Sequence, residues 1–206
     1  QIIGLSLKVA LPATAFGLPP GIALAYLLSR YNFPGKALLS GLTHLPLILP
    51  PVVTGYALLL LFGRSGPLGS WLEPLGIVFA FDWTGAALAA AVMGFPLLVR
   101  AVSLSFDLID PRIERAAETL GATPAIRFLT ITLPLALPGI AAGTVLAFAK
   151  ALGEFGATIT FVSSIPGETR TLPLAIYSLT QVPGGEAAAL RLVLISVGVS
   201  IAALLV

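Results

Sequence analysis

The sequence contains no cysteine and only one histidine, His44, among its 206 residues. Disulfides, thiol catalysis and cysteine-based zinc sites are therefore excluded, and a multi-histidine metal centre is excluded as well. Charged residues make up only 10% of the chain, against about 25% in an average soluble domain. The formal net charge of +2 comes without the Lys/Arg clustering that nucleic-acid binding needs. We therefore expect no metal, no cofactor and no nucleic-acid partner.

Enzymatic motifs are missing as well. No Gly-x-x-x-x-Gly-Lys-Ser/Thr phosphate loop occurs, because the Pro-Gly-Lys-Ala stretch around Lys36 lacks both the upstream glycine and the hydroxyl. No nucleophile–base set stands out in the apolar segments. We therefore predict a chain that is not an enzyme and that does not bind ATP through a phosphate loop.

Apolar residues are abundant at 57% of the sequence. A membrane-spanning helix needs about 20 mostly apolar residues. Five segments meet or approach that length, at about 9–29, 42–62, 83–99, 128–149 and 190–206. The sequence thus predicts an all-α integral membrane protein with one transmembrane domain over residues 1–206. The prolines from Pro46 to Pro51 indicate either ordinary kinks or a bend beside a pathway.

Basic residues gather in two of the predicted loops. The positive-inside rule places such loops in the cytoplasm, which puts the N-terminus outside and the C-terminus inside. The residues concerned are Arg30 and Lys36 after the first segment, and Arg100, Arg112, Arg115 and Arg127 between the third and fourth.

The range 153–185 does not have the pattern of a simple loop. Its two apolar pieces, 158–162 and 172–179, are too short to span a membrane. Irregular backbone at membrane depth is tolerated where it is buried in protein or lines a water-filled cavity. The range is therefore either a re-entrant, pathway-lining region or an external loop with a short surface helix.

The range 107–128 is polar, unlike its surroundings. Asp110 followed by Pro111 predicts a helix start with an Asp cap and a proline in the first turn. Ala116 and Ala117 give a small apolar face, and Gly121 permits a turn. Read from its residues alone, this is a short helix lying across the cytoplasmic face, either resting on lipid or contacting another protein.

This loop resembles the cytoplasmic loop of ATP-binding cassette importer permeases. That loop reads Glu-Ala-Ala, three residues, Gly, nine residues, Ile-x-Leu-Pro. Ala116, Ala117, Gly121 and the run from Ile131 to Pro134 match it in spacing. Arg115 departs from the pattern, since Glu114 stands one position earlier, which weakens any role for the first acidic residue. Three further stretches are similar to permeases of molybdate importers, namely FPGKALL, HLPLILPPVVTGY and LGEFGATITFVSSIPGETRTLP.

The resemblance implies a fold and a set of partners. The fold would be the type I importer permease core (MetI-like), with about five transmembrane helices, in the cytoplasmic (inner) membrane of a prokaryote. The partners would be cytoplasmic ATPase subunits, a periplasmic or lipid-anchored oxyanion-binding protein and a second permease copy, all within membrane lipid. The function would be molybdate import by alternating access, with sulfate, thiosulfate or tungstate as alternative substrates. The residues implied in ATPase coupling are Arg115, Ala116, Ala117, Glu118 and Gly121.

Candidate pathway residues follow from the chemistry of a tetrahedral dianion. Hydroxyls and backbone N–H groups favour anions, although a hydroxyl in a spanning helix usually bonds its own backbone. Glu154 is an unusual membrane carboxylate. It either pairs with Lys150, one helical turn earlier, or acts as a gate, as a contact to the delivering protein or in proton coupling. The candidates are Thr54, Tyr56, Glu154, Gly156, Thr158, Thr160 and Ser163.

Two other classes of protein compete with a permease. A secondary transporter driven by an ion gradient would need paired intramembrane carboxylates or an inverted repeat, and the sequence offers one such carboxylate and no repeat. A membrane scaffold would not explain the small-residue helix beside proline-broken segments.

Overall fold

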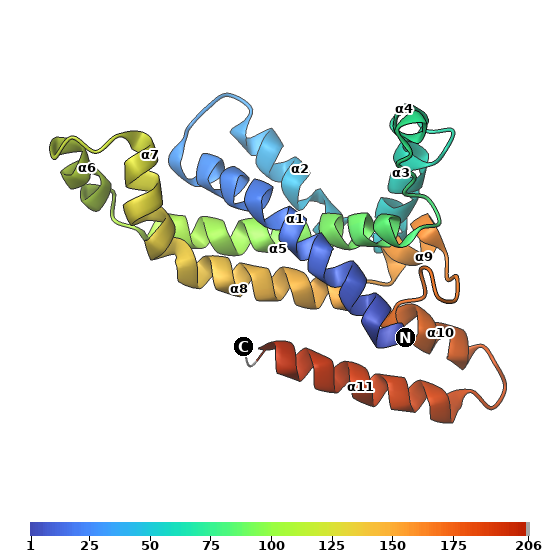
Figure 1. Cartoon of the computed structure of the whole chain (residues 1–206). Helices are drawn as coiled ribbons and strands as arrows, with labels where there is room; N and C mark the ends of the chain where they lie inside the picture. Colours follow the sequence, from blue (N-terminus) through green and yellow to red (C-terminus); the bar gives the residue numbers. More distant parts are fainter. Residues whose placement is uncertain (205–206) are drawn as a thin grey trace.

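Three long helices, α1 (Ile2–Arg30), α5 (Trp83–Leu108) and α8 (Leu133–Leu152), pack together as the core of the molecule (Figure 1). The computed structural model describes residues 1–204. Every regular element in this part is helical. The remaining elements are α2 (Lys36–Ile48), α3 (Pro51–Phe62), α4 (Gly69–Leu72), the 3₁₀ turn η1 (Glu73–Leu75), α6 (Pro111–Thr119), α7 (Pro124–Arg127), the π-helical turn η2 (Phe128–Thr132), α9 (Gly156–Val162), α10 (Leu172–Thr180) and α11 (Glu186–Leu204).

Small residues let the core helices approach closely. A Cβ at Gly94 of α5 would lie 3.0 Å from the Ala147 carbonyl oxygen of α8, and one at Gly21 of α1 would lie 2.6 Å from the Leu98 side chain of α5. Helices in a membrane associate largely through such close packing, because lipid tails are as apolar as the side chains. The alanine- and glycine-rich sequence of α5 therefore explains why it is the central helix.

The predicted first, third and fourth spans are confirmed as long apolar helices. Within the described residues, the helical segments Ile2–Arg30, Trp83–Leu108 and Pro124–Leu152 are long and apolar enough to cross a membrane. Each is longer than its predicted range. Their internal prolines, such as Pro96 and Pro138, leave the helices continuous.

The second predicted span, 42–62, is not one straight helix. α2 and α3 meet at a bend of 114°, and the two together count as a fourth span if the pair is taken as one. Leu49 is extended because it precedes a proline, and α3 begins with Pro51 in its first turn. Of the two interpretations of the proline cluster, the structure therefore shows a sharp bend and not an ordinary kink. The fifth predicted segment lies in α11, and its end at Val206 lies outside the described residues.

The connections between the core helices lie at opposite ends of the bundle. α6 and α7 extend from one end, whereas α4, α9 and α10 lie at the other (Figure 1). The range 153–185 forms α9 and α10, and both helices have buried side chains, among them Phe161 and Leu174. α9 packs on α3 and α5, and α10 packs on α11 and the start of α1.

Candidate functional site

The polar helix α6 is built by local chemistry at both of its ends. The Asp110 side chain accepts a hydrogen bond of 2.8 Å from the Arg112 N–H, and Pro111 occupies the first turn. At the other end Gly121 has φ +84°, a conformation that glycine adopts without the cost other residues meet. The Ala122 N–H closes the end on the Ala117 carbonyl, at 3.0 Å. The predicted cap and turn are confirmed.

The surface of α6 is open. The helix has no buried residue, and its main spatial neighbours are α7 and η2, which follow it in the chain. Among the predicted coupling residues Arg115, Ala116, Glu118 and Gly121 are exposed, and Ala117 is half-buried. A small apolar face of this kind is available for contact with another molecule.

Glu118 has a partner inside the loop. Its carboxylate lies 2.8 Å from Nη1 of Arg127, so the pair links α6 to α7. Thr123 caps the start of α7, because its hydroxyl accepts from the Ile126 N–H at 3.4 Å. The loop therefore folds back on itself without covering α6.

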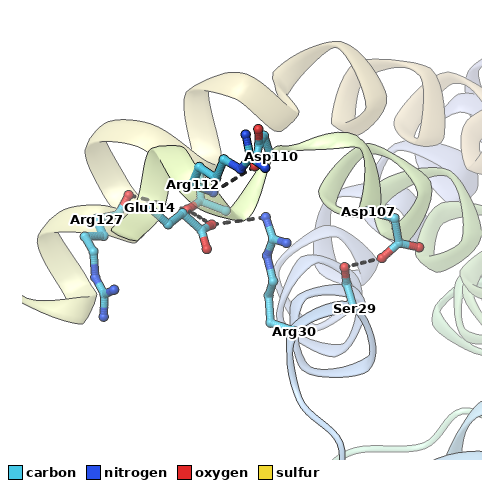
Figure 2. A network of polar contacts seen from close by, with 8 residues as sticks. Ser29, Arg30, Asp107, Asp110, Arg112, Glu114 and Arg127 are labelled. Carbon is cyan, nitrogen blue, oxygen red and sulfur yellow. Dashed lines mark hydrogen bonds and ion pairs between the residues drawn. The ribbon is translucent and has the colours of Figure 1, made fainter. Parts of the chain in front are cut away.

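A second glutamate of α6 makes contacts that the sequence did not predict (Figure 2). Oε1 of Glu114 accepts hydrogen bonds from Nη2 of Arg30 at 3.1 Å and from the Thr132 hydroxyl at 2.7 Å. Next to Arg30, the Ser29 hydroxyl donates to the Asp107 carboxylate of α5. The only sequence signal was the opposite charge of Arg30 and Glu114, which lie in the two loops predicted to be cytoplasmic.

At the other end α3 and α9 approach each other closely. A Cβ added at Gly55 would lie 2.4 Å from the Ala157 carbonyl oxygen, and one at Gly156 would lie 2.7 Å from the Pro51 ring. The structure thus brings the predicted residues Thr54, Gly156 and Thr158 into one contact region, with Thr54 and Thr158 both buried.

The predicted hydroxyls differ in how they are bonded. Thr158 and Thr160 donate to the carbonyls four residues earlier, Glu154 and Gly156, as is usual in spanning helices. The Thr54 hydroxyl is buried and has no hydrogen-bond partner among the described residues. Thr54 is therefore the buried candidate whose hydroxyl is not already bonded within the described residues.

Tyr56 and Ser163 are exposed and lie outside the buried contact region of α3 and α9. A surface cavity of about 790 Å³ near the end of α3 is lined by other residues, among them Arg64, Ser65 and Asp82. None of the predicted pathway residues lines this cavity.

Glu154 forms the predicted ion pair with Lys150, at 2.7 Å, and is only 3% exposed. Its second carboxylate oxygen accepts from the Ala157 N–H at 3.0 Å, so the side chain also caps the first turn of α9. The pair offsets two charges that would be expensive at membrane depth. It holds the joint between α8 and α9.

The chain combines long apolar helices with an open polar helix at one end of the bundle and a buried, proline-bent region at the other. This combination is typical of a helical membrane transport protein. Residues 17–206 match the family model described as "Binding-protein-dependent transport system inner membrane component", and the chain belongs to that family. It is therefore a multi-pass protein of the inner membrane and a transport subunit.

Individual relatives agree with this family. The chain is 59% identical to the molybdenum transport system permease protein ModB of Escherichia coli K12, across 100% of the chain and 90% of that protein. It is 54% identical to the ModB protein of Haemophilus influenzae, across 98% of the chain and 89% of that protein. The chain superimposes on a crystal structure of a bacterial ABC transporter involved in alginate import, with a TM-score of 0.77 at 20% sequence identity. The match covers 99% of this chain and 76% of the chain in that structure. The type I importer permease fold predicted from the sequence is thereby confirmed.

Proposed function

We propose that the chain is the permease subunit of an ATP-binding cassette importer that moves molybdate across the cytoplasmic membrane by alternating access. The observation that carries this function is the similarity to molybdenum permeases across the whole chain. Tungstate and sulfate or thiosulfate remain the alternative substrates. Molybdate and tungstate share charge and shape, and no residue here separates them.

The energy for transport comes from a separate ATPase subunit that binds α6. The exposed small face of α6, with Ala116 and Ala117, suits a groove on such a partner, and Gly121 supplies the turn beside it. Arg115 and Glu118 provide polar contacts at the rim. Closure of the ATPase dimer on ATP then moves the two α6 helices and shifts the spans between inward-open and outward-open states, which must be close in energy.

The oxyanion passes beside the contact of α3 and α9. Thr54 offers a buried hydroxyl without a partner, and Gly156, Thr158, Thr160, Tyr56 and Ser163 are the other pathway residues of this proposal. Glu154 is the gate candidate, although its pairing with Lys150 and its capping of α9 already account for it structurally. The core helices offer no cluster of Lys or Arg. The passage therefore binds weakly, and a periplasmic or lipid-anchored protein selects the oxyanion.

The complete pathway forms between two copies of the chain. α11 carries small residues on more than one of its faces, Ser196, Gly198, Ser200 and Ala202, which permit close helix packing. The basic residues of the α6 end support a cytoplasmic position for that end, so the proposal has the N-terminus outside and the C-terminus inside.

Radiolabelled molybdate uptake into proteoliposomes tests the function. The vesicles hold the chain, its ATPase and its binding protein, and Gly121→Trp serves as the uncoupled variant. We expect the wild type to take up molybdate in an ATP-dependent manner, without competition from sulfate. We expect the Gly121→Trp variant to lose this uptake. Uptake that ignores ATP and follows an imposed ion gradient would instead identify a secondary transporter.

A further inference from the structure

We propose that Glu114 is a positioning residue that transmits the movement of α6 to the core, through Arg30 into α1 and through Thr132 into α8. The inference rests on the proposed function, because it assumes that a partner moves α6. It concerns the path of that movement inside the chain and not the surface on which the partner binds.

The first argument is connectivity. The backbone of α6 lies mainly against the elements that follow it in the chain, α7 and η2. The bond from Arg30 to Glu114 joins residues 84 positions apart and reaches α1, which packs along α5 and α8. Ser29, the residue before Arg30, is itself bonded to Asp107 of α5. The last turn of α1 is therefore held to the core on one side and to α6 on the other (Figure 2).

The second argument is shielding. The side chains of Arg30 and Glu114 are 14% and 17% exposed, and Thr132 is 1% exposed. Tyr26 packs beside them, edge-on to the rings of Phe106 and Phe128 at 5.5 and 4.9 Å. A pair removed from water interacts more strongly than a surface pair, and breaking it leaves a poorly solvated charge. The link is therefore stiffer than an exposed ion pair would be.

The third argument is the backbone at Thr132. This residue ends η2, the π-helical turn through which α7 runs into α8. Single π turns occur often at functional sites and mark places where a helix can change its geometry. Nε of Arg30 is buried without a hydrogen-bond partner among the described residues. The network thus has an unused donor that a second arrangement of this turn can satisfy.

Uptake per ATP hydrolysed separates this role from a merely structural one. In the reconstituted complex, Glu114→Gln and Thr132→Val should hydrolyse ATP but lose transport, with uptake per ATP falling about tenfold for the first. The matched controls are Glu73→Gln, at an exposed pair with Arg64, and Thr130→Val, an exposed threonine of the same π turn. Both controls should stay within about twofold of the wild type. The double charge swap Arg30→Glu with Glu114→Arg should restore part of the lost coupling.

A second readout does not depend on the substrate. The chain has no cysteine, so Leu27→Cys on α1 and Arg112→Cys on α6 can carry spin labels without background. Distances between them in the assembled complex should stay narrowly distributed with and without ATP, and should broaden when Glu114→Gln is added. An unchanged distribution, or uptake and hydrolysis that fall in parallel, would overturn the link. A wild type that carries no molybdate but gives the expected distances would overturn the proposed substrate and leave the link standing.

Discussion

Two glutamates stand at opposite ends of the bundle and are built in different ways. Glu154 is buried, and its partners are Lys150 and Ala157, four residues before it and three residues after it. Glu114 is partly shielded, and its partners lie 84 and 18 residues away on other elements. One carboxylate organises its own turn of chain, whereas the other joins three separate elements.

The difference shows what each contact can do. A carboxylate bonded within one turn fixes local backbone geometry, and it keeps its partners when neighbouring helices move. A carboxylate bonded across elements senses and transmits the relative position of those elements. We therefore expect substitutions at Glu154 to cost stability and substitutions at Glu114 to cost coupling, with a smaller loss of stability.

The largest expected effect on stability is that of Glu154→Ala. The change removes an ion pair and a helix cap together and leaves Lys150 without its partner, which costs about 3 kcal/mol. Thermal unfolding of the purified chain in detergent measures this loss. Glu168→Ala, at an exposed position of the same region, is the control and should change little. Equal losses at the two positions would show that the buried pair adds nothing.

Gly55→Val should be next in size. The new side chain would meet the Ala157 backbone, which cannot rotate away, so α3 and α9 must separate at a cost of about 2 kcal/mol. Gly41→Val on α2 is the matched control, since nothing lies within 4 Å of a Cβ there. The comparison uses the same unfolding assay. If the control loses as much as Gly55→Val, helix propensity and not packing would explain the effect.

Much of the fold is visible in the sequence because it depends on local patterns. Long apolar runs predict α1, α5 and α8, and a short polar signal predicts the cap at Asp110. The bend before α3 follows from the prolines, although its angle does not. The burial of α9 and α10 depends on packing against distant helices, so the sequence left it open.

The site was less predictable for the same reason. The pair of Lys150 and Glu154 was found because the two residues are one helical turn apart. Arg30 and Glu114 escaped prediction because nothing in either segment specifies the other. The Thr158 hydroxyl bonds the Glu154 carbonyl four residues earlier, whereas the buried Thr54 hydroxyl has no partner among the described residues. Residue type alone does not distinguish the two threonines.

Glu114→Gln should lower stability by only about 1 kcal/mol, because the amide still accepts from Thr132 and loses only the ionic part of its bond to Arg30. The swap Arg30→Glu with Glu114→Arg should recover this loss, since the Thr132 hydroxyl can accept as well as donate. The swap Lys150→Glu with Glu154→Lys should not recover, because a lysine cannot accept from the Ala157 N–H. The unfolding temperatures of the two double variants test this difference. If both double variants regained the wild-type stability, the capping role of Glu154 would be contradicted.

The smallest expected effect belongs to the pair of Glu118 and Arg127, which links α6 to α7 on the surface. Glu118 is 61% exposed, so its coupling to Arg127 should contribute only about 0.3 kcal/mol. A double-mutant cycle of Glu118→Gln and Arg127→Gln, followed by thermal unfolding, isolates that coupling. This coupling should vanish at high salt, because dissolved ions then screen the attraction between solvent-exposed charges within a few ångströms. The same cycle on Arg30 and Glu114 should keep most of its coupling at high salt, because those side chains are shielded. Equal salt dependence of the two cycles would mean that solvent reaches both pairs alike, and the stiffness argued for the Glu114 link would be lost.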